Sequence, residues 1–321
     1  MTKMFKMSAV VAAMLMTTTA VHAQTYQYNT VPEGDITLCF SQVVMNHPFR
    51  VAMVESFEQV VAGMEGVTGV VTDAQGDATR EIANIESLIA RGCNAIIVSS
   101  LSGRAIYPAY REVADAGIPL IIAASGVPEE EGIPYVSFVS TEEVSMGERA
   151  FDYIAARLGG EGNIVQLQGV PESTNSILRR EGFNAQAQYW PNIVTVADQS
   201  GQWLRLPARQ VMANILQANS DIDAVFAYND EMALGAIQAL EDAGRTDVFV
   251  VGMDGQKESL EVIQSGDLFA MTIANEWRMD TAIETAVAAV RGEAVPQRVV
   301  LRVPMITDDN IDAHYDPEAV F

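Results

Sequence analysis

Short apolar runs alternate with amphipathic helical segments along the chain from Ile36 to about Val303. Most of these runs are continuous rather than alternating, which is typical of strands that are covered on both faces. The pattern predicts eleven strands, at residues 36–41, 69–72, 95–99, 120–123, 135–139, 163–167, 193–197, 224–227, 248–252, 269–273 and 298–303.

The segments between the strands carry helix start and stop signals. Asp77 can cap a helix that runs to Arg91, and Gly92 can end it. Gly159 and Gly160 close a helix predicted over 142–158. Alternation of strand and helix indicates parallel sheets with crossover helices.

Eleven strands exceed one doubly wound sheet of ordinary size, so the sequence predicts an α/β chain with two doubly wound parallel-sheet lobes. We find no linker rich in Pro, Gly or Ser between two halves, and no short repeat. We therefore expect the chain to cross between the lobes within the regular alternation.

The first residues resemble a secretory signal peptide. Lys3 and Lys6 precede an apolar run over 7–16, and Ala23 stands before Gln24 in a cleavage-site pattern. The apolar run is too short to span a bilayer. We expect cleavage after Ala23, so that 1–23 are removed, and release into the periplasm, because a lipid-anchored protein would carry Cys where Gln24 stands.

Charge removes two classes of partner. The formal net charge is −23, and it becomes −25 once Lys3 and Lys6 are lost (−23 − 2). Such a surface repels nucleic acid and anionic lipid. The exported compartment permits a disulfide between Cys39 and Cys93, but no spacing rule requires one, so we expect both thiols to be free and buried.

Polar residues recur where the predicted strands end, which is where open parallel sheets bind ligands. Amide, hydroxyl and carboxylate groups pair with sugar hydroxyls, and flat aromatic rings match the C–H faces of a sugar. Packing between helix and sheet is an equally open role for Trp203, and Asp230 is assigned to capping the next helix. The predicted ligand-binding residues are Ser41, Gln42, Phe49, Arg50, Ser99, Thr141, Arg179, Trp203, Asn229, Asp254 and Asn275.

Enzymatic chemistry is not supported by this inventory. The chain after residue 23 has two histidines, His47 and His314, with no cysteine or carboxylate at metal-ligand spacing. It has no nucleophile elbow and no phosphate loop. We predict no catalytic residue, no metal and no cofactor.

Two motifs carry a family resemblance. AVFAYNDEMALGA at 224–236 and VVGMDG at 250–255 resemble the ribose-binding family of periplasmic proteins, and the likeness includes LQG at 167–169 and EGF at 181–183. The resemblance implies a type I periplasmic binding fold with crossovers near Thr141, Asn275 and Arg302. It implies an N-terminal lobe of 36–140 plus 276–302 and a C-terminal lobe of 141–275 plus 303–321. All predicted site residues except Gln42 and Arg50 match the family's sugar-contacting positions.

The resemblance also implies a function: a monomeric solute-binding component of an ABC importer, which delivers a small sugar or polyol to a membrane permease. Presentation of the closed form to a chemoreceptor stays open. A sugar-responsive transcription regulator shares the two-lobed core, but it would need a helix-turn-helix and a basic face in place of this signal peptide and acidic surface.

One departure from the family bears on the ligand. Ribose binders end the fourth strand with Asp-Arg, where this chain has Ala124 and Ser125. FSQV at 40–43, followed by Phe49 and Arg50, is similar to a furanose-binding branch. If Arg50 replaces the missing guanidinium, Arg50 and Arg179 face Asp254 alone, an excess of one positive charge. An acidic sugar is therefore an alternative ligand.

Overall fold

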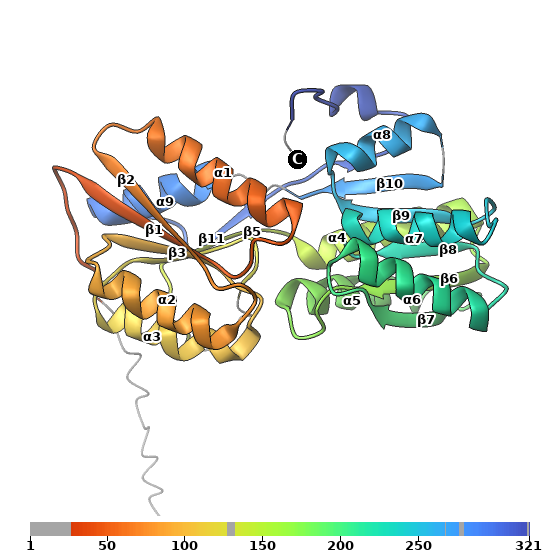
Figure 1. The fold of residues 1–321 in the computed structure, drawn as a ribbon, viewed down its shortest axis with the longest axis horizontal. Helices are drawn as coiled ribbons and strands as arrows, with labels where there is room; N and C mark the ends of the chain where they lie inside the picture. The colour runs from red at the N-terminus through yellow and green to blue at the C-terminus, as the bar shows by residue number, and fades with distance from the viewer. Residues whose placement is uncertain (1–26, 127–131, 267, 276–278, 320) are drawn as a thin grey trace, which may run out of the picture.

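The computed structural model describes residues 27–126, 132–266, 268–275, 279–319 and 321, so the predicted signal peptide lies outside the described chain. These residues form two α/β lobes, each built on a six-stranded sheet (Figure 1). Within these ranges, every helix falls short of the length and apolar character that a membrane span requires.

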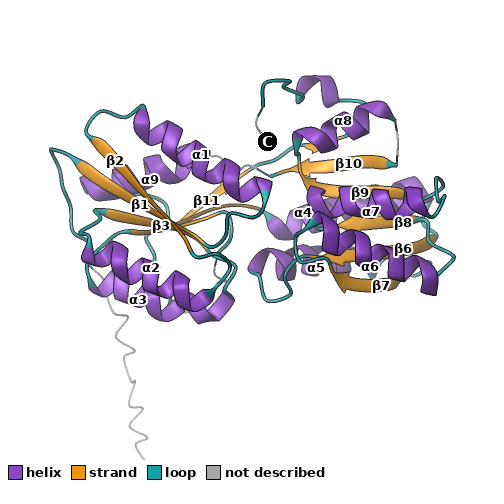
Figure 2. Ribbon diagram, viewed as in Figure 1, coloured by secondary structure: helices purple, strands orange, loops and turns teal. Residues whose placement is uncertain are grey.

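The first lobe has a fully parallel sheet in the order β11-β5-β4-β3-β1-β2. Its strands are β1 (Ile36–Gln42), β2 (Val67–Asp73), β3 (Ala95–Ser99), β4 (Leu120–Ala123), β5 (Ser137–Thr141) and β11 (Arg298–Leu301). Helices α1 (Pro48–Ala62) and α9 (Met279–Arg291) cover one face, and α2 (Ala78–Ala90) and α3 (Tyr107–Asp115) cover the other (Figure 2). Because helices shield both faces, β3 and β4 are buried along their whole length, as continuous apolar runs predict.

The second lobe has the order β12-β10-β9-β8-β6-β7. Its strands are β6 (Gly162–Gln168), β7 (Ile193–Ser200), β8 (Ala224–Ala227), β9 (Phe249–Asp254), β10 (Phe269–Ala274) and β12 (Met305–Ile306). Its helices are α4 (Glu143–Leu158), α5 (Thr174–Ala187), α6 (Arg205–Ala218), α7 (Asp230–Asp242) and α8 (Lys257–Ser265). β12 is the strand that the apolar pattern missed: it has two residues and pairs antiparallel with β10, so this sheet is mixed.

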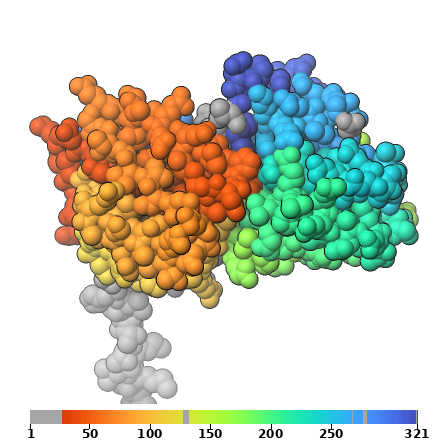
Figure 3. All heavy atoms as spheres, in the orientation of Figure 1, coloured from red at the N-terminus to blue at the C-terminus, as the bar shows by residue number. Residues whose placement is uncertain are grey.

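The chain passes between the two sheets three times, as predicted. It leaves the first sheet after β5, returns to it after β10, and leaves it again between β11 and β12. The passages fall beside Thr141, Asn275 and Arg302. In the space-filling view the two lobes meet along a seam (Figure 3).

Helix caps follow the sequence signals at two helices and differ at a third. Asp77 accepts from the backbone N–H of Arg80 at 2.8 Å, and Gly159 ends α4 in the left-handed conformation. The assignment of Asp230 as a cap is wrong. Asn229 caps α7, because its extended backbone lets Oδ1 accept from the N–H of Met232 at 3.0 Å.

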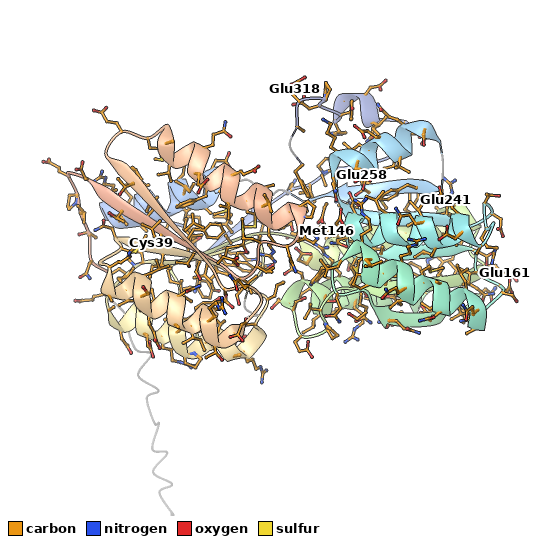
Figure 4. The ribbon with its side chains drawn as sticks, viewed as in Figure 1. Cys39, Met146, Glu161, Glu241, Glu258 and Glu318 are labelled. Atoms are coloured by element: carbon orange, nitrogen blue, oxygen red, sulfur yellow. A yellow bond between two sulfur atoms is a disulfide. The ribbon has the colours of Figure 1, made fainter. Side chains whose placement is uncertain are left out.

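The expectation of free thiols is also wrong: Cys39 and Cys93 form a disulfide. Cys39 lies on β1 in the first lobe (Figure 4), and Cys93 lies two residues before β3, the neighbour of β1 in the sheet. This adjacency brings the two Cα atoms within 6.0 Å, inside the range that a disulfide spans. Sequence spacing cannot show it, because the sheet order decides which strands become neighbours.

The disulfide should stabilise the first lobe. It closes a loop with a sequence separation of 54, for which lost chain entropy in the unfolded state predicts about 4 kcal/mol. We expect the double variant Cys39→Ala, Cys93→Ala to lose most of this free energy of unfolding in a denaturant titration. Wild-type protein with a reductant should lose a similar amount, and two titratable thiols in the oxidised protein would contradict the bond.

Candidate ligand-binding site

A cavity of about 450 Å³ lies between the lobes, at the carboxyl ends of the strands of both sheets. Its size suits a small ligand. The N-terminal ends of α1, α5 and α7 contribute to its wall. Seven of the predicted site residues line it: Phe49, Arg50, Arg179, Trp203, Asn229, Asp254 and Asn275.

The other four predicted residues, Ser41, Gln42, Ser99 and Thr141, are buried and do not line the cavity. Ser99 accepts from Arg50 Nη1 at 2.5 Å, and Gln42 Oε1 lies 3.4 Å from the same nitrogen. Ser125 accepts from Arg50 Nη2 at 2.8 Å. Three first-lobe side chains therefore fix the guanidinium of Arg50. Through Ser125, Arg50 reaches the end of β4, where this chain has Ala124 and Ser125 in place of the Asp-Arg pair of ribose binders.

The second-lobe wall is organised by an ion pair. Arg179 Nε donates to Glu143 Oε2 at 2.5 Å, and Nη1 donates to the carbonyl of Tyr228. Both side chains are almost fully buried. They meet because α4 and α5 cross closely at two glycines. A Cβ on Gly147 would lie 2.1 Å from the carbonyl oxygen of Arg179, and a Cβ on Gly182 would lie 1.9 Å from that of Val144.

Asp254 lies where two of the crossover segments meet. Its Oδ1 accepts from Asn275 Nδ2 at 3.3 Å, and Asn275 Oδ1 lies 3.2 Å from the hydroxyl of Thr141. Asp254 has a φ of 131°, a conformation that L-residues adopt only under constraint. Strain of this kind gathers at binding sites, where the surrounding structure holds the residue in place.

The two predicted aromatic residues each pair with a guanidinium. The central carbon of Arg50 lies 5.5 Å from the ring centroid of Phe49, and that of Arg179 lies 5.5 Å from the ring of Trp203. Trp203 also packs on Gly169, where a Cβ would lie 1.9 Å from Cε2. The indole therefore both packs and lines the cavity, which combines the two alternatives considered for it.

The predicted excess of positive charge is wrong, because Glu143 pairs with Arg179. Burial lowers the pKa of Arg50 to about 10, with Glu81 and Asp254 opposing the shift, so Arg50 stays charged at neutral pH. Burial also acts to lower the pKa of Arg179, but Glu143 and Asp254 outweigh it and the pKa is raised. Two guanidinium groups therefore face Glu143 and Asp254, with Glu81 adding a further carboxylate nearby.

The carboxyl of Asp254 itself resists ionisation. Burial raises its pKa well above the usual value, partly opposed by Arg179 and reinforced by Asp230. Burial raises the pKa of Asp230 to about 6, against the hydrogen bonds from Thr272 and the N–H of Gln256. Glu143, which pairs with Arg179, and Glu81, whose own pKa burial also raises, are further carboxyl groups close to the two arginines.

Sequence reasoning missed four functional candidates: His47, Ser125, Glu143 and Asn175. Asn175 precedes Arg179 by four residues on α5, a spacing that places both on one helix face and would have indicated it. His47 directly precedes α1 and could have been recognised as a cap. Glu143 carries no such signal, because its pairing depends on how two helices cross.

His47 connects the lobes. It caps α1 in the first lobe, where Nδ1 accepts from the N–H of Phe49 at 3.2 Å, and Nε2 lies 2.7 Å from Asn229 Nδ2 in the second. Asn229 must present its nitrogen, because Oδ1 caps α7 and Nδ2 also donates to the carbonyl of Trp203. Both ring nitrogens therefore face N–H groups. A neutral imidazole accepts at only one of its nitrogens, and a second ring proton would find no acceptor at either contact.

Metal chemistry finds no support in the described ranges, where no group of three or more His, Cys, Asp or Glu side chains is placed to hold an ion. The charged groups of the cavity are engaged in ion pairs and hydrogen bonds within the protein. Two α/β lobes with charged and amide side chains around a cavity between them are typical of solute-binding proteins.

Known proteins place the chain more closely. The family model for the periplasmic binding protein domain matches residues 38–294. The chain is 32% identical to the ribose import binding protein RbsB of Escherichia coli, over 88% of this chain and 93% of that protein. It is 35% identical to the xylitol-binding protein of Mycolicibacterium smegmatis, over 74% of this chain and 68% of that protein.

Solved structures agree with the family match. A solute-binding protein of Mycobacterium smegmatis with bound glycerol has a TM-score of 0.84 and 31% identity, covering 90% of this chain and 99% of that one. A solute-binding protein of Bacillus halodurans with bound myo-inositol has a TM-score of 0.82 and 29% identity, covering 88% and 97%. The chain belongs to the periplasmic binding protein family, on the ribose-binding branch, and this is a family of binding proteins rather than enzymes.

The environment of His47 predicts a pH dependence. Burial, helped by Arg50 and opposed by Glu231, lowers its pKa from 6.5 to about 4. The unfolded chain then binds more protons than the native chain between these values, so stability falls as pH falls below 6.5. Relative to His47→Asn, which keeps a capping side chain, the wild type should lose about 2 to 3 kcal/mol of unfolding free energy from pH 7.5 to 4.5.

Urea titrations at several pH values measure this difference. The variant His314→Asn is the control, because it removes the exposed histidine and should follow the wild-type curve. Parallel curves for wild type and His47→Asn would show that His47 does not have to stay neutral in the native protein.

Proposed function

We propose that this chain is the periplasmic solute-binding component of an ABC importer and that it binds a neutral sugar or sugar alcohol between its lobes. The observation that carries the proposal is the charge-balanced cavity, in which two guanidinium groups on aromatic rings stand beside carboxylates and amides. Planar groups of this kind match the donor and acceptor pattern of vicinal hydroxyls. The relatives named above are described with ribose, xylitol, glycerol and myo-inositol, which are all neutral and polyhydroxylated.

The role of each residue follows from its place. Arg179 and Asp254 are the proposed energetic anchors, since both are buried ionisable groups at the cavity wall. Arg50 forks ligand hydroxyls from the first lobe, and Phe49 and Trp203 pack on the C–H faces of the ligand. Asn229 and Asn275 add amide groups. Gln42 and Ser99 hold Arg50 from behind, and Thr141 holds Asn275.

The cellular role rests on the family and on the N-terminal sequence. Export by a signal peptide over 1–23, cleaved after Ala23, would deliver a monomer to the periplasm, where it passes its ligand to a membrane permease. We propose lobes of 36–140 plus 276–302 and 141–275 plus 303–321, which close on the ligand by hinge motion at the three crossovers.

A thermal-shift panel of neutral sugars, polyols, sugar acids, amino acids and nucleosides tests the function. A neutral polyhydroxylated ligand with a dissociation constant near 1 μM, present at a hundredfold excess over that value, should add about 2.7 kcal/mol of stability. Stabilisation by amino acids or nucleosides, and by no carbohydrate, would overturn the assignment.

The charge balance predicts a change of specificity. Glu143→Gln removes the carboxylate that faces Arg179, so the cavity gains one formal positive charge while side-chain shape is kept. We expect the ratio of affinities for a sugar acid and its neutral alcohol to rise at least about tenfold, measured by titration calorimetry. The control is Glu142→Gln, which makes the same charge change at the exposed neighbouring position. An unchanged ratio in Glu143→Gln would show that this charge balance does not select the ligand.

A further inference from the structure

Asn175 occupies the cavity wall at the seam between the lobes. It lies in the first turn of α5, lines the cavity and is 7% exposed. Its amide nitrogen makes two hydrogen bonds, one within the second lobe to Glu143 Oε1 at 2.8 Å and one to the carbonyl of Ala124 in the first lobe at 3.2 Å. One side chain thus contacts the cavity, the buried ion pair and the opposite lobe.

The orientation of this amide follows from its partners. Glu143 Oε1 and the carbonyl of Ala124 are both acceptors, so the nitrogen of Asn175 must face them. A flipped amide would place its oxygen against two oxygens. Oδ1 is therefore the free end, and it is buried without a hydrogen-bond partner among the described residues.

A buried acceptor without a donor destabilises this arrangement of the lobes, because it has lost its water and gained no hydrogen bond in return. Oδ1 is in this condition while Nδ2 donates to the carbonyl of Ala124. A ligand hydroxyl directed at Oδ1 removes the cost, whereas an ether oxygen, a carboxylate or a C–H group does not. The amide of Asn175 is thus linked both to the opposite lobe, through Nδ2, and to the choice of ligand, through Oδ1.

We propose that Asn175 is a specificity-determining residue that makes lobe closure depend on a hydroxyl donor of the ligand. The inference rests on the proposed function, since it assumes a polyhydroxylated ligand. Oδ1 accepts from one ligand hydroxyl, and Nδ2 holds the carbonyl of Ala124. The residue therefore rejects analogues that lack this one hydroxyl and sets how firmly the lobes close on those that carry it.

The neighbouring residue provides a matched control. Thr174 also donates to a first-lobe carbonyl, that of Gly126, but it does not line the cavity. Thr174→Val removes an interlobe hydrogen bond with little change of shape. It should weaken every ligand by the same factor, because only the seam is affected.

Titration calorimetry with D-ribose, xylitol, myo-inositol and glycerol identifies the best-bound probe, and its monodeoxy derivatives form the test set. In the wild type, one monodeoxy derivative should have an affinity at least about tenfold lower than that of the parent, and this loss should exceed the loss of every other derivative. In Asn175→Ala and in the similarly sized Asn175→Leu, the parent should weaken about tenfold or more, and that derivative should then bind within about twofold of the parent.

Each outcome decides something. A uniform loss across all derivatives in both Asn175 variants, as in Thr174→Val, would overturn the inference and reduce Asn175 to a seam contact. Wild-type protein that binds none of the four probes or any other carbohydrate would overturn the proposed function, and the inference with it. Circular dichroism and urea titration establish that each variant is folded, and the two variants of Asn175 serve as replicates of the same deletion.

Discussion

The buried ion pair between Glu143 and Arg179 is the interaction on which the second-lobe wall depends. A buried carboxylate and a buried guanidinium each lose their hydration, so each needs the other and further hydrogen bonds to be tolerated. The close crossing of α4 and α5 at Gly147 and Gly182 supplies the geometry. Glu143 then orients Asn175, and Arg179 orients itself between Glu143, the carbonyl of Tyr228 and the ring of Trp203. Removal of either partner would leave the other charge unpaired in the protein interior, and the side chains that this pair orients would lose their fixed positions.

Charged and neutral interactions are divided between the lobes in a way that suits reversible closure. Glu143 and Arg179 both belong to the second lobe, and the guanidinium of Arg50 donates hydrogen bonds to the first-lobe residues Gln42, Ser99 and Ser125. Neutral hydrogen-bonding contacts cross the seam from Asn229 to His47, from Asn175 to Ala124 and from Thr174 to Gly126. A neutral hydrogen bond contributes only about 0.5 to 1.5 kcal/mol net, because water replaces it on opening. The lobes can therefore separate without breaking the buried ion pair between Glu143 and Arg179. Ligand contacts can then determine the equilibrium between open and closed arrangements.

The fold was largely predictable because most strands form a continuous apolar run that can be recognised from the local sequence. All eleven strands predicted from apolar runs are present, and the three passages between sheets fall where the resemblance implied. The errors concern information that is not local. The disulfide between Cys39 and Cys93 depends on which strands become neighbours, and the partner of Arg179 depends on a helix crossing. The prediction of Asp230 rather than Asn229 as the cap misplaced the start of α7 by one residue, and helix ends are the part of a fold that sequence signals locate least precisely. β12, with two residues, is too short to produce a pattern.

The site shows why strand ends predict polar positions better than they predict ligand contacts. A buried charged group at the cavity wall needs acceptors or donors behind it, and here some of these come from strand ends of the kind that also supply the lining residues. Ser99 and Gln42 follow the pattern as well as Asp254 does, yet they hold Arg50 instead of lining the cavity. A list of polar residues at strand ends thus contains both residues that line the cavity and residues that hold them from behind. Only their burial and hydrogen-bond partners in the structure distinguish the two groups. Ser99 and Ser125 set where Arg50 points, so we expect substitutions there to alter ligand preference if Arg50 contacts the ligand as proposed. On that proposal, specificity depends on the residues behind the cavity wall as well as on those that line it.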